Sequence, residues 1–100
     1  MGTITDILKE YVEFTVKKLV DNPDEVEVKI MISTKSVIVQ IKVAKIDCGK
    51  VIGKRGRTIE SLKVIVLAIK RTHFSEDNRR VSLEILEEET NYVKNKIKEE

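Results

Sequence analysis

The amino-acid sequence predicts an α+β domain in which helices cover one face of a three-stranded sheet. Two observations predict this class. Apolar residues recur every three to four positions in some segments, which is typical of helices, and every second position in others, which is typical of strands. The segments follow in the order helix, strand, strand, helix, helix, strand, helix, without an internal repeat or an interdomain linker. Such an order favours helices packed against one side of a sheet.

The first segment, over 3–20, predicts an amphipathic helix. Its apolar residues repeat with a period near 3.6, and Thr3 and Asp6 have the spacing of a capping pair. The helix must end before Pro23, because proline lacks the backbone N–H that a helix interior requires and disfavours a helical conformation at Asn22. We therefore expect a turn between this helix and the next element.

Two runs rich in β-branched residues, over 26–33 and 37–44, predict a β-hairpin. A short polar link around Lys35 separates them. In the second run, apolar residues occupy every other position from residue 37 to residue 43, and Gln40 and Lys42 lie between them. One face of this strand is therefore expected to be covered and the other to face water.

Two helices are expected after the hairpin, with a break between them. The first covers 47–52, with Asp47 as its N-cap, and the second runs from the residue after Gly56 to about Thr72. The break is the segment 53–56, in which two glycines lie three residues apart. The sequence thus predicts a helix, a glycine loop and a second helix in direct succession.

A third strand and a charged extension complete the chain. Residues 81–86 alternate apolar and polar side chains and predict a strand. Residues 87–100 hold three apolar side chains among many charges and predict a short helix. We therefore divide the chain into a domain over 1–86 and a C-terminal helical extension over 87–100.

Composition excludes several functional classes. The 100 residues include one His and one Cys, which cannot form a zinc site of the usual spacing or an intramolecular disulfide. The longest apolar run, 64–69, is far too short to span a membrane, and the N-terminus has no signal-peptide pattern. We expect a cytoplasmic protein without a cofactor, a metal, a small-molecule substrate or a membrane partner.

Charge is unevenly distributed along the chain. Residues 1–41 carry a net charge of −2, residues 42–80 carry +7 from 11 basic and 4 acidic side chains, and residues 81–100 carry −3. A basic middle third with acidic flanks suggests one surface directed at a polyanion. The alternative is a helix face that is merely solvated.

The basic third contains the glycine loop. Lys54 and Arg55 lie between its two glycines, which permit backbone angles that other residues avoid and let another backbone come close. The N-terminus of the following helix adds free N–H groups and a positive dipole end, so phosphate is the expected ligand. Neighbouring aliphatic side chains could form the floor of a groove for unstacked bases. The candidate RNA-binding residues are Lys50, Val51, Ile52, Gly53, Lys54, Arg55, Gly56, Arg57, Thr58 and Ile59.

The string Ile52-Gly53-Lys54-Arg55-Gly56, in a helix–GXXG–helix unit, resembles the K-homology (KH) domain. The wider segment from Val43 to Ile59 is similar to the small bacterial KH proteins of the KhpA (YlqC) family, and the likeness extends over about 4–86. The resemblance implies a type II KH fold with a mixed sheet, and single-stranded RNA as the ligand. It further implies a grip on about four nucleotides, a role as an RNA chaperone or post-transcriptional regulator, and a homodimer or a heterodimer with a KhpB (Jag)-type KH protein.

Other readings of the sequence are weaker. The segment from Gly49 to Arg55 is one residue short of a Walker-type phosphate loop, and His73 has no Cys or Ser partner at a catalytic spacing, so we expect no enzyme. Cys48 is expected to be a buried packing residue rather than a reactive thiol. Four further cations leave open whether the positive region extends beyond the loop: Lys70, Arg71, Arg79 and Arg80.

The main alternative function is a dimerising or docking adaptor in which RNA binding is secondary. The charged extension and the apolar residues of the terminal helices support it.

The aromatic residues limit the possible mode of RNA recognition. None of the four flanks the glycine loop, so stacking platforms of the kind used by RRM sheets are not expected.

Overall fold

The structure is a computed structural model that describes residues 3–87. Its elements appear in the predicted order, and no end of a helix or strand lies more than one residue from its predicted position. The expected helix in the C-terminal extension lies outside the described residues, except that Glu87 is the last residue of the third strand. The helices and strands are α1 (Ile4–Leu19), β1 (Glu27–Ile32), β2 (Ser36–Val43), α2 (Cys48–Ile52), α3 (Arg57–His73) and β3 (Arg80–Glu87).

The start and end of α1 follow from local chemistry. The Thr3 hydroxyl accepts a hydrogen bond from the Asp6 backbone N–H at 3.2 Å, and the Asp6 carboxylate accepts one from the Thr3 backbone N–H at 3.4 Å. This is the predicted capping box. The helix ends at Leu19, four residues before Pro23, and its buried residues lie four apart: Ile4, Leu8, Val12 and Val16.

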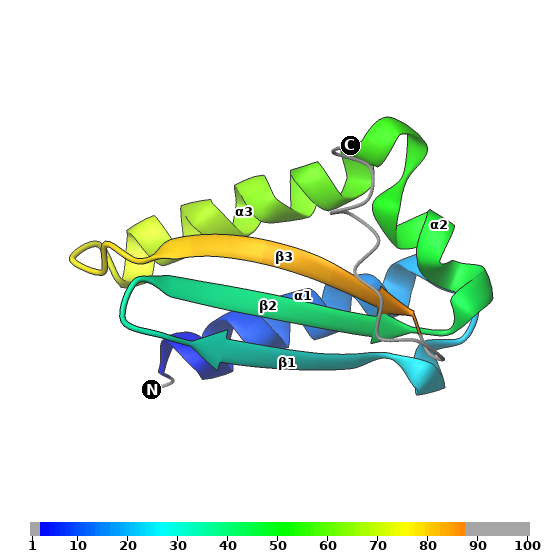
Figure 1. The fold of residues 1–100 in the computed structure, drawn as a ribbon, viewed down its shortest axis with the longest axis horizontal. Helices are drawn as coiled ribbons and strands as arrows, with labels where there is room; N and C mark the ends of the chain where they lie inside the picture. The colour runs from blue at the N-terminus through cyan, green and yellow to red at the C-terminus, as the bar shows by residue number, and fades with distance from the viewer. Residues whose placement is uncertain (1–2, 88–100) are drawn as a thin grey trace.

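The sheet is mixed, with β2 between β1 and β3 (Figure 1). β1 and β2 form an antiparallel hairpin, whereas β2 and β3 are parallel. A parallel connection cannot be made by a tight turn, so the chain crosses over through α2 and α3 before it returns as β3. In the register, Ile41 lies opposite both Val28 and Ile85, at the centre of the core.

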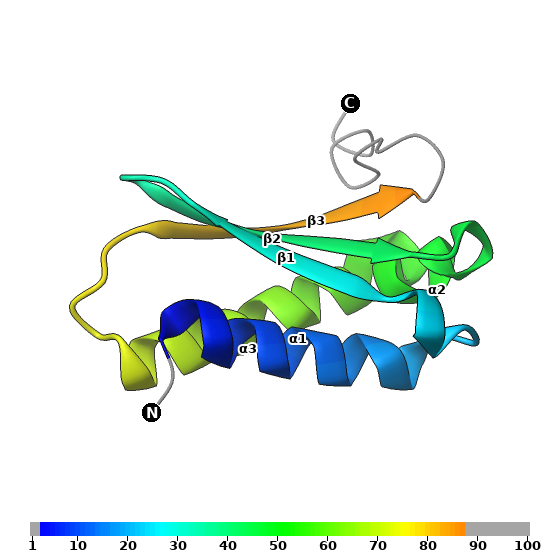
Figure 2. The same ribbon diagram turned by 90° about the horizontal axis from the view of Figure 1, so that it is seen from below.

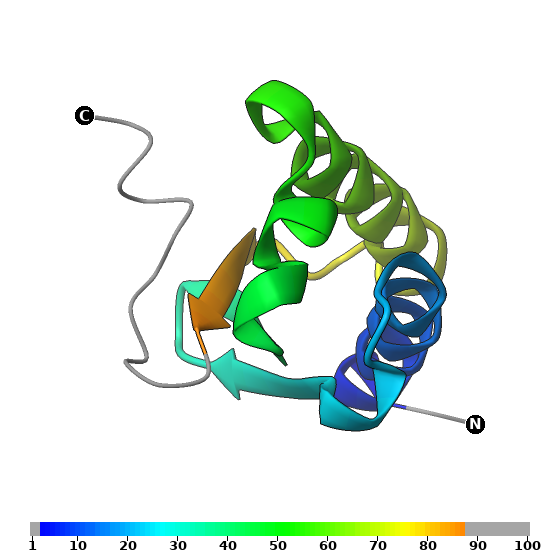
Figure 3. The ribbon, with the colours of Figure 1, turned by 90° about the vertical axis from the view of Figure 1, so that its right-hand side faces the viewer.

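The helices cover one face of the sheet, as predicted (Figure 2). Along β2, the residues at 37, 39, 41 and 43 are fully or almost fully buried, and those between them are half-buried. This alternation places a continuous apolar core between the sheet and the pair α1 and α3. Viewed from the end of the molecule that carries the glycine loop, α2 lies between the sheet and α3 (Figure 3). Within residues 3–87, no helix combines the length and apolar character needed to cross a membrane.

Candidate nucleic-acid interface

Two hydrogen-bonded turns follow each other between α2 and α3. The Gly53 N–H closes α2 by donating to the Gly49 carbonyl at 2.8 Å, and the Gly56 N–H donates to the Gly53 carbonyl at 3.1 Å. Gly53 has φ 79° and ψ 171°, and Gly56 has φ 74° and ψ 15°. Both values lie in regions that favour glycine. The two glycines of the loop therefore adopt backbone angles that other residues avoid, as expected from the sequence.

Arg55 shares this left-handed conformation, with φ 58° and ψ 26°, and within residues 3–87 it is the only non-glycine residue with positive φ. A left-handed conformation costs an L-residue roughly 1–2 kcal/mol. The sequence gives no sign of it, because arginine is not among the residue types that adopt this conformation readily. Strain of this kind often occurs at binding loops, where the surrounding structure enforces it.

Three cations project from the loop and the helix that follows it. Lys54, Arg55 and Arg57 are exposed, and none of them forms an ion pair with another residue in the described part of the chain. α3 begins here, and no side chain caps its N-terminal N–H groups. These groups and the positive end of the helix dipole thus lie beside the three cations, an arrangement that attracts phosphate.

Lys50 differs from the other candidate cations. Its Nζ lies 3.2 Å from Oδ2 of Asp21 and 3.9 Å from Oδ1 of Asp47. The Lys50 side chain is 45% exposed, so water also reaches it. Because two carboxylates already balance much of its charge, Lys50 should attract an external anion less strongly than Arg57 does.

The aliphatic candidates belong mainly to the core. Val51 has no exposed surface, and Ile52 and Ile59 are 7% and 9% exposed. Val51 therefore supports the loop from inside, and only narrow edges of Ile52 and Ile59 face solvent. Thr58 is half-buried in the first turn of α3 and packs directly against Gly53.

Asp47 anchors the start of α2 in a way that the sequence did not reveal. Its carboxylate was expected to cap α2 but makes no capping hydrogen bond. It is fully buried and accepts hydrogen bonds from the Asp21 N–H at 3.2 Å, the Asn22 N–H at 3.0 Å and the Asn22 side-chain amide at 3.1 Å. Burial raises the pKa of Asp47, but these hydrogen bonds and the charge of Lys50 outweigh it, and the pKa lies below its ordinary value. The carboxylate thus ties α2 to the turn after α1.

The cations near the end of α3 do not join the loop. Lys70 lies thirteen residues after Arg57 on the same helix, about 20 Å away at 1.5 Å per residue. It is buried, and its Nζ donates to the Asp77 carbonyl and lies 3.9 Å from the Asp77 carboxylate. Arg79 donates through Nε to the same carboxylate at 2.9 Å. Arg71 and Arg80 are exposed at this distal end.

Cys48 is buried, as predicted. Cys48 is 4% exposed, and its Sγ lies 3.8 Å from the Ala44 carbonyl oxygen, so it packs inside the domain. His73 is exposed at the end of α3. Neither of them contributes to the glycine loop.

Comparison with known proteins identifies the family. A family model described as KhpA/KhpB, KH domain, matches residues 9–85. The chain is similar to proteins named RNA-binding protein KhpA from several bacteria. The Aquifex aeolicus protein is 45% identical over 80 residues, which is 80% of this chain and 96% of that protein. For Chlamydia trachomatis the identity is 44% over 81 residues, or 81% and 99% of the two chains, and for Borreliella burgdorferi it is 41% over 78 residues, or 78% and 90%. The resemblance predicted from the glycine loop is thereby confirmed, and the chain belongs to the KhpA/KhpB family of KH-domain proteins.

Proposed function

We propose that this protein binds single-stranded RNA through the loop Gly53–Gly56 and the first turn of α3. The observation that carries the proposal is a group of three exposed cations at a helix N-terminus, on a backbone turn that contains two glycines with positive φ. None of the three forms an ion pair with a residue in the range 3–87. Relatives that cover four-fifths of the chain are named RNA-binding proteins, which supports the same ligand class.

In this proposal the loop acts as a clamp on the RNA backbone. Lys54, Arg55 and Arg57 contact phosphates, and backbone N–H groups in the first turn of α3 donate hydrogen bonds to the same anions. About four nucleotides pass over the loop. Their bases lie against the exposed edges of Ile52 and Ile59, while Val51 and Thr58 keep the clamp in shape. Lys50 contributes less, because Asp21 and Asp47 already balance its charge.

The proposed mode of recognition is tolerant of sequence. Stacking on aromatic rings requires exposed Phe, Tyr or Trp beside the bound bases. The described aromatic residues lie elsewhere, with Tyr11 and Phe14 on α1 and Phe74 just after α3. Backbone contacts and aliphatic surface carry little base information, so we expect modest sequence preference. This suits an RNA chaperone or post-transcriptional regulator in the cytoplasm.

We further propose that the chain acts as a homodimer or pairs with a KH protein of the KhpB type, as the family resemblance implies. An adaptor that uses the fold mainly for protein contacts is the alternative. The two functions differ in what the loop cations contribute, because an adaptor without RNA binding has no need of them.

A salt titration of RNA affinity tests the clamp. With about three phosphate contacts, the logarithm of affinity should fall with the logarithm of salt concentration with a slope near −2. Changing Lys54→Asp together with Arg55→Asp should abolish measurable binding of a single-stranded oligonucleotide. The control is Lys9→Asp with Lys17→Asp, which makes the same charge change on exposed positions of α1. If the folded loop variant keeps both the affinity and the slope of the wild type, the clamp is wrong and the adaptor function is favoured.

A further inference from the structure

The tip of the β1–β2 hairpin lies beside the start of β3, at the end of the molecule opposite to the glycine loop (Figure 1). Between them is a surface hollow of about 390 Å³, the distal hollow, which is lined by Thr34, Lys35, Asn78, Arg79 and Arg80. Each of these side chains can donate a hydrogen bond, and none of them is acidic. The distal hollow is therefore suited to an anion with several oxygen atoms, such as a phosphate group.

The cations of the distal hollow are not fully neutralised within residues 3–87. Lys35 and Arg80 are exposed, and neither forms an ion pair with a residue of that range. Arg79 donates to the Asp77 carboxylate, but the Nζ of the buried Lys70 lies 3.9 Å from the same carboxylate. One acid is thus shared by two cations, so the hollow keeps an excess of positive charge that attracts a polyanion.

Hydrogen bonds fix the two walls of the distal hollow relative to each other. The Arg80 N–H donates to the Lys35 carbonyl at 2.9 Å and so joins the hairpin tip to β3. The Arg79 N–H donates to the Asp77 carboxylate at 3.0 Å, within the segment that leads into β3. Because the backbone that carries the cations is already ordered, binding an anion there costs less conformational entropy.

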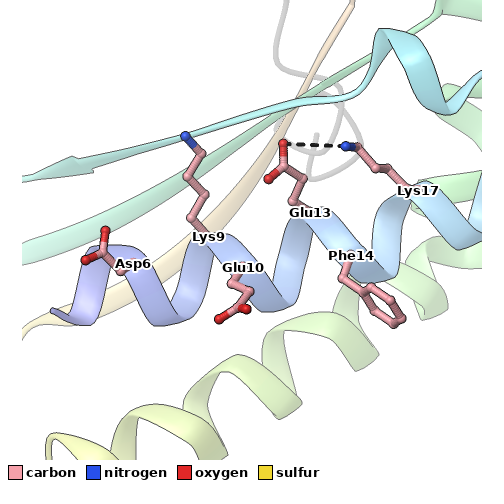
Figure 4. A pocket seen from close by; sticks show the side chains of 6 residues that line it. All are labelled: Asp6, Lys9, Glu10, Glu13, Phe14 and Lys17. Atoms are coloured by element: carbon pink, nitrogen blue, oxygen red, sulfur yellow. Dashed lines mark ion pairs between the residues drawn. The ribbon is translucent and has the colours of Figure 1, made fainter. Parts of the chain in front are cut away.

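A hollow on the outer surface of α1 provides a comparison. Its lining residues include three acids, and the Nζ of Lys17 lies 3.9 Å from the Glu13 carboxylate (Figure 4). These acids would repel a phosphate group. Of these two hollows, only the distal one suits a polyanion, and the lysines of the α1 hollow supply control positions for charge changes.

We propose that the distal hollow is a second phosphate site, which binds the backbone of an RNA strand beyond the nucleotides held by the loop Gly53–Gly56. The inference rests on the proposed RNA clamp and extends it. α3 joins the two ends of the molecule, and its 17 residues span about 25 Å at 1.5 Å per residue. Successive phosphates of a stacked strand lie about 3.4 Å apart, so about seven nucleotides separate the two sites. An RNA of about four nucleotides reaches only the loop, whereas a strand of about twelve reaches both sites.

RNA affinity as a function of strand length tests this site. The full chain is titrated with single-stranded oligonucleotides of about four and about twelve nucleotides. Lys35→Gln together with Arg80→Gln should weaken binding of the longer RNA about tenfold and reduce the slope of log affinity against log salt by about 1.4, because two phosphate contacts are lost. Binding of the shorter RNA should equal that of the wild type, which also shows that the variant is folded. Lys9→Gln with Lys17→Gln removes the same charge from α1 and should leave both affinities unchanged.

The loop variant Lys54→Asp with Arg55→Asp distinguishes a failure of this site from a failure of the clamp. If the loop variant loses RNA binding but the distal variant binds the longer RNA as the wild type does, the distal site is overturned and the clamp stands. An equal loss for both RNA lengths in the distal variant also overturns the site, because the hollow would then act only through the overall charge. If the loop variant binds both RNAs like the wild type, the clamp and the inference built on it both fail.

Discussion

Gly53 and Thr58 lie so close together that there is no room for a side chain at position 53. A Cβ atom on Gly53 would lie 2.2 Å from Oγ1, 2.6 Å from Cβ and 2.7 Å from the backbone nitrogen of Thr58. Gly53 also has a positive φ of 79°. The first glycine of the loop is therefore fixed both by its backbone conformation and by the first turn of α3.

Gly53→Ala should destabilise the domain and reshape the loop. The backbone strain alone costs about 1–3 kcal/mol of the free energy of unfolding, and the overlap with Thr58 adds to it. Urea unfolding measures the free energy of unfolding, and the affinity for a short RNA reports whether the loop keeps its binding conformation. Removing the Thr58 side chain should not restore stability, because the Thr58 backbone nitrogen also blocks the new methyl group.

Gly49→Ala is the matched control for this substitution. Gly49 lies within α2, and a Cβ placed there meets nothing within 4 Å. Alanine in a helix interior is favoured over glycine by about 0.5–1 kcal/mol, so the variant should be as stable as the wild type or slightly more stable. A Gly53→Ala variant as stable as Gly49→Ala would contradict the geometry described for the loop.

Arg55→Gly should separate stability from binding. Glycine removes the cost of the left-handed conformation at φ 58°, so the free energy of unfolding should not fall and should rise by up to about 1 kcal/mol. RNA affinity should fall several-fold, because an exposed cation of the proposed clamp is lost. Lys54→Gly is the comparison: its φ is not positive, so the same change should destabilise the protein. Equal affinity in the Arg55→Gly variant and the wild type would remove Arg55 from the clamp.

Arg57→Ala and Lys50→Ala should differ in their effect on RNA binding. Arg57 has no ion pair in the described part of the chain, whereas the charge of Lys50 is balanced by Asp21 and Asp47. Loss of one phosphate contact reduces the slope of log affinity against log salt by about 0.7 for a single strand. We expect a change of about this size for Arg57→Ala and a smaller one for Lys50→Ala. A larger change in slope for Lys50→Ala than for Arg57→Ala would show that Lys50 breaks its ion pairs with Asp21 and Asp47 when RNA binds.

The elements of this fold were predictable because each is encoded locally. The capping pair Thr3 and Asp6, the stop at Pro23 and the alternation along β2 follow from short-range spacing, and all three appear in the structure. The glycine loop was predictable for the same reason, since two glycines three apart between helical segments already indicate a tight turn.

The features that the sequence did not predict depend on distant partners. The Asp47 carboxylate accepts hydrogen bonds not from its own helix but from the backbone of Asp21 and Asn22, which lie 26 and 25 residues earlier in the chain. The burial of Lys70 depends on Asp77 in the following loop. An aspartate at a helix start is normally expected to cap the helix, and a lysine near a helix end is normally expected to face solvent. The observed partners of Asp47 and Lys70 are brought close only by the folded arrangement of the chain.

Asp47→Asn should weaken the link between α2 and the turn after α1. An amide of the same shape keeps one acceptor oxygen and replaces the other with an NH₂ group. This group faces either the Asp21 N–H or the two Asn22 donors, so at least one buried donor loses its partner. We expect a lower Tm at pH 7. Because the pKa of Asp47 in the folded protein lies below its ordinary value of 3.8, ionised Asp47 stabilises the fold above that pH. This contribution is lost as the pH falls through the folded pKa.

The difference in Tm between the wild type and Asp47→Asn should therefore be largest near neutral pH and shrink below about pH 3.8. Thermal unfolding followed by circular dichroism at several pH values measures it. Asp24→Asn is the control, because Asp24 is exposed in the same turn, and its Tm difference should stay small throughout. A constant difference between pH 7 and pH 3 would mean that the Asn22 and Asp21 contacts stabilise the fold through shape alone. In that case the charge of the buried carboxylate would contribute nothing to holding α2, and with it the glycine loop, in place.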